Sequence, residues 1–429
     1  MNSIKSTALT LFDDVDVQMD IERNTRVTFY PLHNIVPGAP IEFHIPGTAD
    51  EYMDIGDLNI LMQLKIIKKD KKAWDPTTED VAFINLPISS CFQDVFLYVK
   101  DTQVEGGQHL YPYNGYLSSF LQFHPSAKKT HMQCWGWHED TPGKFSDTDN
   151  NDGHDARDKE TVGGKIWEVN GPLFLDLTHQ ERYLMPSTSL RLKFIPAKPE
   201  FVLLSKTAST NYDYEIVKCE LQVPRVSCID SVLSGHNAGL DKHNAKYWLN
   251  HVDLTTFTIT SENKQFIKDS LYTSQVPKLL CIGLLDHDAF NGNIQKNPFD
   301  FQHFNLDRIG LYRDGVLVPG QILTPDYAND HYTRAYNQTI TSLKYFNTDD
   351  SNGMTMEHFK SGYNLYVFDL TPDGSPQGPH RHLMRTGSLR LELGFKTKLA
   401  QPVTVLMFAL IDAKMEITKL RDILVSYAR

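Results

Sequence analysis

The same short segment occurs twice in this chain, and that repetition limits the folds that the chain can adopt. Residues 182–192 read RYLMPSTSLRL, residues 381–391 read RHLMRTGSLRL, and seven of the eleven positions match without a gap. The two segments lie 199 residues apart in a chain of 429 residues. Such a repeat indicates two copies of one structural unit, provided that other segments repeat in the same order.

Two other pairs of segments meet that condition. Residues 95–113 match 309–327 at an offset of 214, and FLDLT at 174–178 matches VFDLT at 367–371. The longer pair shares Leu97 with Leu311, Tyr98 with Tyr312, Val104 with Val318, Gly106 with Gly320, and Tyr113 with Tyr327. Because the offset falls from 214 to 199 along the chain, the first copy has longer insertions. Loops accept insertions, whereas strands would lose their register.

The hydrophobic pattern is typical of β-strands. Apolar residues alternate with more polar ones in 58–67, and the alternation in 212–223 predicts one face made of Val217, Cys219, Leu221 and Val223. Residues 403–411 are apolar on both faces, which indicates a strand that is covered on both sides. Helical periodicity is sparse, and 115–123 is the best short helix. The pattern predicts an all-β protein of the sandwich type.

The repeat also divides the chain. We expect an N-terminal arm at 1–24, a first sandwich at 25–227, a linker at 228–246 and a second sandwich at 247–429. The longest insertion of the first copy, 139–165, is rich in Asp, Asn, Gly and Lys and has no apolar period. It is therefore predicted to be an exposed acidic loop.

The repeated strands supply the expected core of each copy. Alternation turns the two leucines of each Leu-Arg-Leu triplet to one side and the arginines, Arg191 and Arg390, to the other. The arginines are expected either in ion pairs or in solvent. The predicted repeat core consists of Leu97, Tyr98, Leu190, Leu192, Leu311, Tyr312, Leu389 and Leu391.

Composition excludes several classes of protein. The formal net charge of −11 opposes nucleic acid, so no direct sequence-specific binding of nucleic acid is expected. The basic stretch KIIKKDKK, 65–72, is predicted to be a solvated hairpin tip, with a nuclear import signal as the alternative. No apolar run is long enough for a membrane span. Five cysteines without a CxxC pair indicate a reducing compartment.

No pattern of catalytic or metal-binding residues repeats with the strands. A cupin-type metal site needs a Glu shortly after its HxH pair, but His380 and His382 are followed by an acidic residue only at Glu392. The spacing of His131, Cys134 and His138 lacks a fourth ligand, and the tryptophans around it indicate packing. The loop residues Asp147, Asp149, Asn151 and Asp158 match a calcium loop poorly and offer at most a weak cation site. We therefore expect no enzyme activity, no cofactor and no dedicated metal site.

Several segments resemble one family. Residues 87–123 and 283–318 are similar to the two signature regions of hexon-type, double jelly-roll major capsid proteins from Maverick/Polinton-like elements, adintoviruses and their relatives. The likeness continues through GYNLYVFDLTPD, 362–373, and RTGSLRLELGF, 385–395, so it covers most of the chain after about residue 30. The acidic loop and the N-terminal arm have no firm match.

The resemblance implies two tandem eight-stranded jelly-roll sandwiches with short helices in loops. It implies a structural capsid protein that forms homotrimers, which act as pseudo-hexameric capsomers of an icosahedral double-stranded DNA virus shell. Its partners would be neighbouring capsomers, penton proteins, and minor capsid or cement proteins. The protein would be made in the host cytoplasm, assemble in the nucleus and reside in the virion.

The sequence leaves two alternative functions open. A tandem jelly-roll glycan-binding protein would also be duplicated, and a minor capsid protein of the same viruses is a nearer rival. The aromatic stretches 110–123 and 297–307 are candidates for subunit interfaces, although packing inside the subunit is the expected role of most of their rings. The exposed apolar side chains of the arm are expected to dock on a neighbouring subunit.

Overall fold

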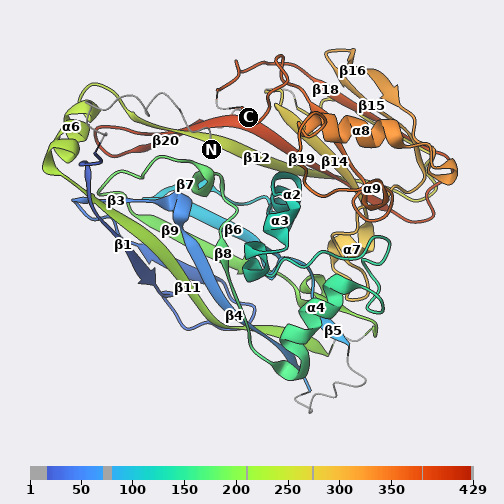
Figure 1. The fold of residues 1–429 in the computed structure, drawn as a ribbon, viewed down its shortest axis with the longest axis horizontal. Coiled ribbons are helices and arrows are strands. Elements are labelled where there is room, and N and C mark those ends of the chain that lie inside the picture. The colour runs from blue at the N-terminus through green and yellow to red at the C-terminus, as the bar shows by residue number, and fades with distance from the viewer. Residues whose placement is uncertain (1–16, 71–79, 209–210, 273–274, 379, 427–429) are drawn as a thin grey trace, which may run out of the picture.

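The computed structural model describes residues 17–70, 80–208, 211–272, 275–378 and 380–426, which form two β-sandwiches side by side (Figure 1). One sheet of the first sandwich has the order β1 (Ile21–Phe29), β11 (Tyr212–Cys228), β4 (Asn59–Lys68) and β8 (Trp167–Pro172), with β3 (Glu51–Met53) beside β11. The other has the order β2 (Ile41–Ile45), β9 (Leu190–Pro196), β6 (Phe92–Val99) and β7 (Thr102–Glu105).

The second sandwich repeats this arrangement. One sheet has the order β12 (Ala245–Ile259), β19 (Val403–Ile417), β14 (Leu279–Asp286) and β17 (Leu365–Asp369), with β20 (Ile423–Ser426) beside β19. The other has the order β13 (Gln265–Lys268), β18 (Leu389–Phe395), β15 (Leu306–Arg313) and β16 (Val316–Leu323). When β3, β20 and the separate pair β5 and β10 are left out of the count, both sandwiches have the same strand order. It is first-eighth-third-sixth in one sheet and second-seventh-fourth-fifth in the other. The prediction of two tandem eight-stranded sandwiches is confirmed.

Short helices occupy the connections. They are α1 (Pro87–Ser90), α2 (Tyr111–Gln122), α3 (Pro125–Lys128), α4 (Asp152–Thr161), α5 (Pro199–Val202), α6 (Asp230–Leu240), α7 (His287–Asn291), α8 (Thr333–Ser342) and α9 (Met356–Lys360). A two-stranded sheet pairs β5 (Val81–Phe83) with β10 (Leu203–Ser205). The helix expected at 115–123 is α2, and the strand expected at 403–411 is the buried first part of β19. No helix among the described residues is long and apolar enough to cross a membrane.

The strand register is the same in both copies. Leu97 of β6 lies opposite Leu192 of β9, and Leu311 of β15 lies opposite Leu391 of β18. The six leucines of the predicted repeat core, Leu97, Leu190, Leu192, Leu311, Leu389 and Leu391, are all buried. In the same two strand pairs, Tyr98 lies opposite Arg191 and Tyr312 lies opposite Arg390.

The two tyrosines do not belong to the core. Tyr98 and Tyr312 each follow an inward-facing leucine, so the alternation of the strand turns them outward, and both are only partly buried. The guanidinium of Arg191 lies 4.3 Å from the centre of the Tyr98 ring. The prediction that these tyrosines form part of the repeat core was wrong, because a shared sequence position does not distinguish the two faces of a strand.

Val217 was also assigned to the wrong face. The pairing of β11 with β4 shifts register between Ile216 and Lys218, which is the mark of a β-bulge. Before the bulge, Tyr212, Tyr214 and Ile216 face the core, and after it Cys219, Leu221 and Val223 do. The extra residue at the bulge is Val217, which is exposed.

Element boundaries differ from the expected segments at the start of each sandwich. β1 begins at Ile21 and pairs with β11, so residues 21–24 belong to the first sandwich, and residues 1–16 of the predicted arm lie outside the described residues. The linker contains helix α6, and β12 begins at Ala245. The basic stretch 65–72 ends β4 and enters a turn, but its last two residues lie outside the described residues.

Candidate functional site

The two aromatic stretches of the sequence meet each other at the junction, the surface along which the two sandwiches are in contact. The ring of Tyr116 on α2 stacks on Phe299 with centroids 4.1 Å apart, and Phe120 stacks on Tyr363 at 4.3 Å. All four rings are buried. These rings are therefore interior packing that joins the two sandwiches, and they are not available to another subunit.

The predicted exposed loop, 139–165, is part of the same junction. It contains helix α4, whose Arg157 is fully buried and pairs with Asp140 at 2.6 Å. Arg157 also donates to the carbonyl oxygen of Phe83 at 2.7 Å. Phe145 is buried against Tyr363 of the second sandwich, at 4.9 Å between centroids. The expectation of an exposed loop was wrong, because one ion pair and one aromatic ring anchor a segment that has no apolar period.

Among the described residues, the three aspartates of the weak cation site predicted in this loop do not converge on one point. Asp147 pairs with Lys144 at 2.8 Å, and Asp149 pairs with Lys206. The side-chain oxygen of Asn151 accepts from the backbone N–H groups of Thr141 and His154 and so caps α4. Burial raises the pKa of Asp158 to about 6, and the nearby Asp80 carboxylate contributes. Asp147, Asp149 and Asn151 therefore bond to other groups, whereas Asp158 Oδ1 is buried and forms no hydrogen bond among the described residues.

Ionisable groups also lie at the junction, around a cavity of about 640 Å³. The Glu105 carboxylate accepts from the backbone N–H groups of Asp176 at 2.7 Å and Leu177 at 2.9 Å. Burial, together with the Asp176 carboxylate, raises the pKa of Glu105 to about 8. Asp176 of the first sandwich lies 2.5 Å from the ring of His251 in the second. This ion pair links the two sandwiches in addition to the aromatic packing.

The repeated Leu-Met pair is placed differently in the two copies. In the first copy Leu184 exchanges two backbone hydrogen bonds with Met53, and the backbone N–H of Met185 donates to the Tyr247 hydroxyl of the second sandwich at 3.1 Å. Leu184 and Met185 are buried, at 0% and 5% exposure. Their counterparts Leu383 and Met384 are 87% and 69% exposed. The Leu-Met pair is therefore buried in the first copy and exposed to solvent in the second.

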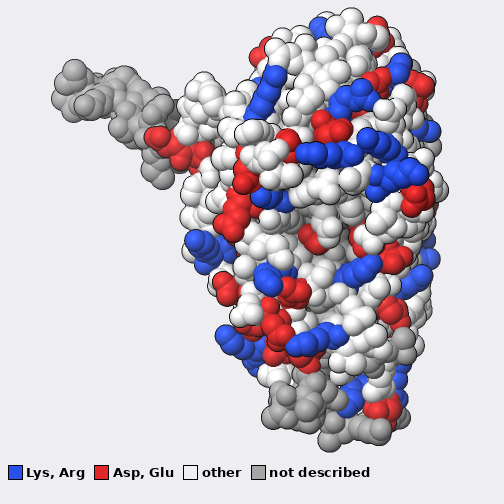
Figure 2. Space-filling view, turned by 90° about the vertical axis from the view of Figure 1, so that its right-hand side faces the viewer, with Lys and Arg blue, Asp and Glu red and all other residues white. Residues whose placement is uncertain are grey.

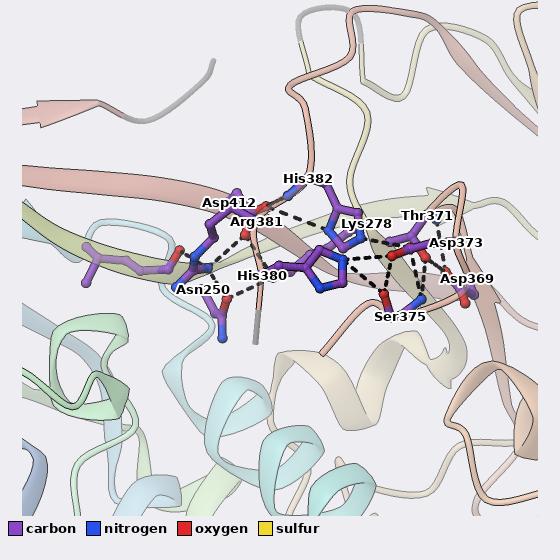
Figure 3. Close-up of polar contacts among 11 residues, drawn as sticks. Asn250, Lys278, Asp369, Thr371, Asp373, Ser375, His380, Arg381, His382 and Asp412 are labelled. Atoms are coloured by element: carbon purple, nitrogen blue, oxygen red, sulfur yellow. Dashed lines mark hydrogen bonds and ion pairs between the residues drawn. The ribbon is translucent and has the colours of Figure 1, made fainter. Parts of the chain in front are cut away.

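The residues just before that exposed pair form a polar cluster that the sequence did not predict (Figure 3). His380 and His382, in the connection between β17 and β18, both direct Nε2 at the Asp373 carboxylate, at 2.7 Å and 3.0 Å. Hydrogen bonds from Ser375, His382 and His380 hold the pKa of Asp373 well below its usual range. The acidic residue beside the HxH pair thus precedes His380 by seven residues, whereas a cupin-type site has its Glu after the pair.

A second carboxylate supports the cluster from β19. Asp412 accepts from Lys278 at 2.9 Å and from Arg381 at 2.8 Å, and its Oδ2 accepts from the backbone N–H of His382 at 3.1 Å. Hydrogen bonds from these bases lower the pKa of Asp412, although burial opposes that change. Figure 3 shows Arg381 pointing to Asp412 while the flanking histidines point to Asp373.

The surface carries both signs of charge. Figure 2 shows Lys and Arg interspersed with Asp and Glu over one face of the molecule. On the face shown, no broad basic area of the kind that binds nucleic acid is visible.

Comparison with known proteins identifies the fold. No protein-family model matches the sequence. An uncharacterized protein of Caenorhabditis elegans is 22% identical over 386 residues, which is 87% of this chain and 90% of that protein.

The solved structures that resemble this chain match it almost end to end. A chain of the Sputnik virophage structure has a TM-score of 0.65 and 13% identity, and the match covers 100% of this chain and 93% of that chain. The mavirus major capsid protein has a TM-score of 0.57 and 10% identity, over 98% of this chain and 93% of that one. The Faustovirus major capsid protein has a TM-score of 0.55 and 8% identity, over 96% and 93%. The chain therefore has the double jelly-roll fold of these viral capsid proteins.

Proposed function

We propose that this protein is the major capsid protein of an icosahedral double-stranded DNA virus or virus-like element, with a structural role and no catalytic one. The observation that carries the proposal is the duplicated sandwich, which matches viral capsid proteins over 96–100% of this chain. The segments noted in the sequence favour the Maverick/Polinton and adintovirus lineage within that group.

A trimer is the assembly that this architecture favours. Three chains in a ring present six similar sandwiches, which gives a pseudo-hexameric block that can tile a shell. Neighbouring capsomers, penton proteins and minor or cement proteins would complete the particle. Apolar side chains on the surface of one chain support such contacts, with Val17 and Met19 at one place and Leu383 and Met384 at another.

The purified full-length chain tests this proposal. Light scattering is expected to give the mass of three 49.0 kDa chains, and electron microscopy of assembled material is expected to show shells built of hexagonal blocks. A chain that stays monomeric at every concentration would contradict the capsid function. Specific binding on a glycan array by that monomer would instead favour the tandem glycan-binding alternative.

The arm can be tested separately. Since β1 begins at Ile21, a truncation that removes residues 1–16 leaves the first sheet intact. We expect folded trimers of unchanged melting temperature whose assembly into shells is weaker. Equal assembly with and without the arm would show that it does not dock on a neighbour.

A further inference from the structure

We propose that Asp373, His380 and His382 bind a divalent transition-metal ion of the zinc class. Each residue offers one ligand atom, and these atoms lie within 4.8 Å of one another (Figure 3). Two imidazole nitrogens and one carboxylate oxygen are a set that Zn²⁺ and its neighbours in the first transition row accept. Three protein ligands leave a coordination position for water or for a group from outside the chain.

The distances between the donor atoms suit an ion with little rearrangement. Ligand atoms about 2.1 Å from a tetrahedral Zn²⁺ ion are roughly 3.4 Å from one another. The Nε2 atoms of His380 and His382 are 2.7 Å and 3.0 Å from the Asp373 oxygens. Reaching that spacing requires the His380 distance to lengthen by about 0.7 Å and the His382 distance by about 0.4 Å, which opens the space that the ion needs. Residue 379 lies outside the described residues.

The far side of His382 provides a second observation. Its Nδ1 atom is buried and forms no hydrogen bond among the described residues. The Asp412 Oδ2 atom lies 4.0 Å from it. Metal-bound histidines commonly donate their other N–H to a carboxylate, which fixes the ring and its tautomer. Asp412 is held in place for that role by Lys278 and Arg381.

One tautomer of His382 leaves room for a cation between His382 and Asp373. If the proton of His382 resides on Nδ1, beside Asp412, then the lone pair of Nε2 faces an Asp373 oxygen at 3.0 Å. Two electron-rich atoms repel at that distance unless a cation lies between them. The basic side chains around the cluster do not supply this positive charge. Lys278 and Arg381 bond to Asp412, and Lys344 bonds to Asp369. A proton on Nε2 is the competitor, because a neutral histidine in that tautomer, like an imidazolium, donates to Asp373 without a metal.

A bound ion would cross-link two parts of the connection between β17 and β18. It would join Asp373 to the segment 380–382, which directly precedes the exposed Leu383 and Met384. The metal would then restrict the motion of the segment that presents this apolar pair. This inference concerns the residues of one chain and does not depend on the proposed function.

Calorimetric titration of the full-length protein with Zn²⁺, after treatment with a chelator, tests the site. We expect one saturable site per chain in the wild type that is lost in H380Q and in H382Q. The side chain of His380 is 53% exposed, so H380Q should fold normally, and its melting curve checks this. The matched control is H44Q, because His44 lies on the exposed side of β2, and it should bind Zn²⁺ like the wild type. The exposed Cys134 and other histidines can also take up metal, so the decisive quantity is the difference between H380Q and H44Q.

Trypsin cleavage after the exposed Arg385 gives a second readout. Zn²⁺ should slow that cut in the wild type and in H44Q, and should leave its rate unchanged in H380Q. No Zn²⁺ uptake by the wild type, or equal uptake by H380Q and H44Q, would overturn the proposal. Cleavage that slows more at acidic pH in the wild type than in H380Q, without any uptake of metal, would show that protons alone hold the histidines on Asp373, and would overturn the proposal as well.

Discussion

The Leu-Met pair of the repeated segment is covered in the first sandwich and bare in the second. Met185 lies beside Tyr247 and Arg421 of the second sandwich, and Leu184 is held by β3. Leu383 and Met384 have no such cover from the described part of the chain and are largely exposed. Six residues after Leu184 and Leu383 the two copies are alike again, since Leu190 and Leu389 are both buried. Duplication therefore preserved the strand interiors, while the surroundings of the connections diverged.

The insertion of the first copy should give the largest effect on folding. Substitution of Arg157 by Ala leaves Asp140 as a buried charge without its partner, and breaking a buried pair costs about 3–5 kcal/mol of unfolding free energy. Lys159→Ala on the exposed side of the same helix should change it by less than about 0.5 kcal/mol. Denaturant unfolding measures both variants. Equal, small losses of unfolding free energy in the two variants would show that the buried ion pair of residues 139–165 does not stabilise the fold.

The matched strands should respond alike. Leu192→Ala and Leu391→Ala each leave a cavity at the same register position of a buried strand pair. Each substitution is expected to lower the unfolding free energy by about 2–5 kcal/mol. Chemical denaturation of the two single variants gives the comparison. A large loss in one copy with almost none in the other would contradict the equivalence of the two cores.

Sequence periodicity predicted the elements whose environment is regular. The leucines of β9 and β18 alternate with polar residues over several positions, so the repeat and its buried face followed from the sequence. The bulge at Val217 could not be predicted from the sequence. One extra residue in the strand shifts the alternation, so that the side chains before it point to the opposite face from the one expected, and no residue type signals the shift. The burial of Arg157 could not be predicted either, since it depends on Asp140 and on the Phe83 carbonyl, a partner distant in the sequence.

The position of Asp373 beside the two histidines was also not predicted from the sequence. The HxH pair was visible in the sequence, but its carboxylate was sought at the position that a different fold would use. Here the chain leaves β17, turns, and returns past Asp373, so a residue before the pair faces both rings. A search for acidic residues on both sides of the pair would have found it.

The exposed Leu-Met pair should affect association more than folding. Met384→Ser is expected to leave the unfolding free energy of the chain within about 0.5 kcal/mol of the wild type, because the side chain is already in solvent. Removal of an apolar contact should nevertheless weaken the proposed trimer, measured by sedimentation over a range of concentrations. Met185→Ser, at the matched position, should instead destabilise the fold, since it places a hydroxyl in a buried site. A trimer unaffected by Met384→Ser would show that this pair lies outside the subunit interface.

The smallest effects are expected at the two arginines of the repeated strand, and they should differ in kind. Arg191 lies over the Tyr98 ring, a contact worth about 0.5–1 kcal/mol at an exposed site. Arg390 lies farther from the centre of its Tyr312 ring, at 5.8 Å, and in addition bonds to Glu392 at 2.5 Å and lies 3.3 Å from Asp269. Exposed ion pairs contribute about 0–1 kcal/mol and weaken in salt. Thermal unfolding of Arg191→Ala and Arg390→Ala at low and high ionic strength separates the two cases. The loss in Arg390→Ala should shrink as salt is added, because the wild type has already lost the attraction, whereas the loss in Arg191→Ala should stay nearly constant. Identical salt dependence in the two variants would mean that the outer faces of the two sandwiches, like their cores, have kept the same interactions.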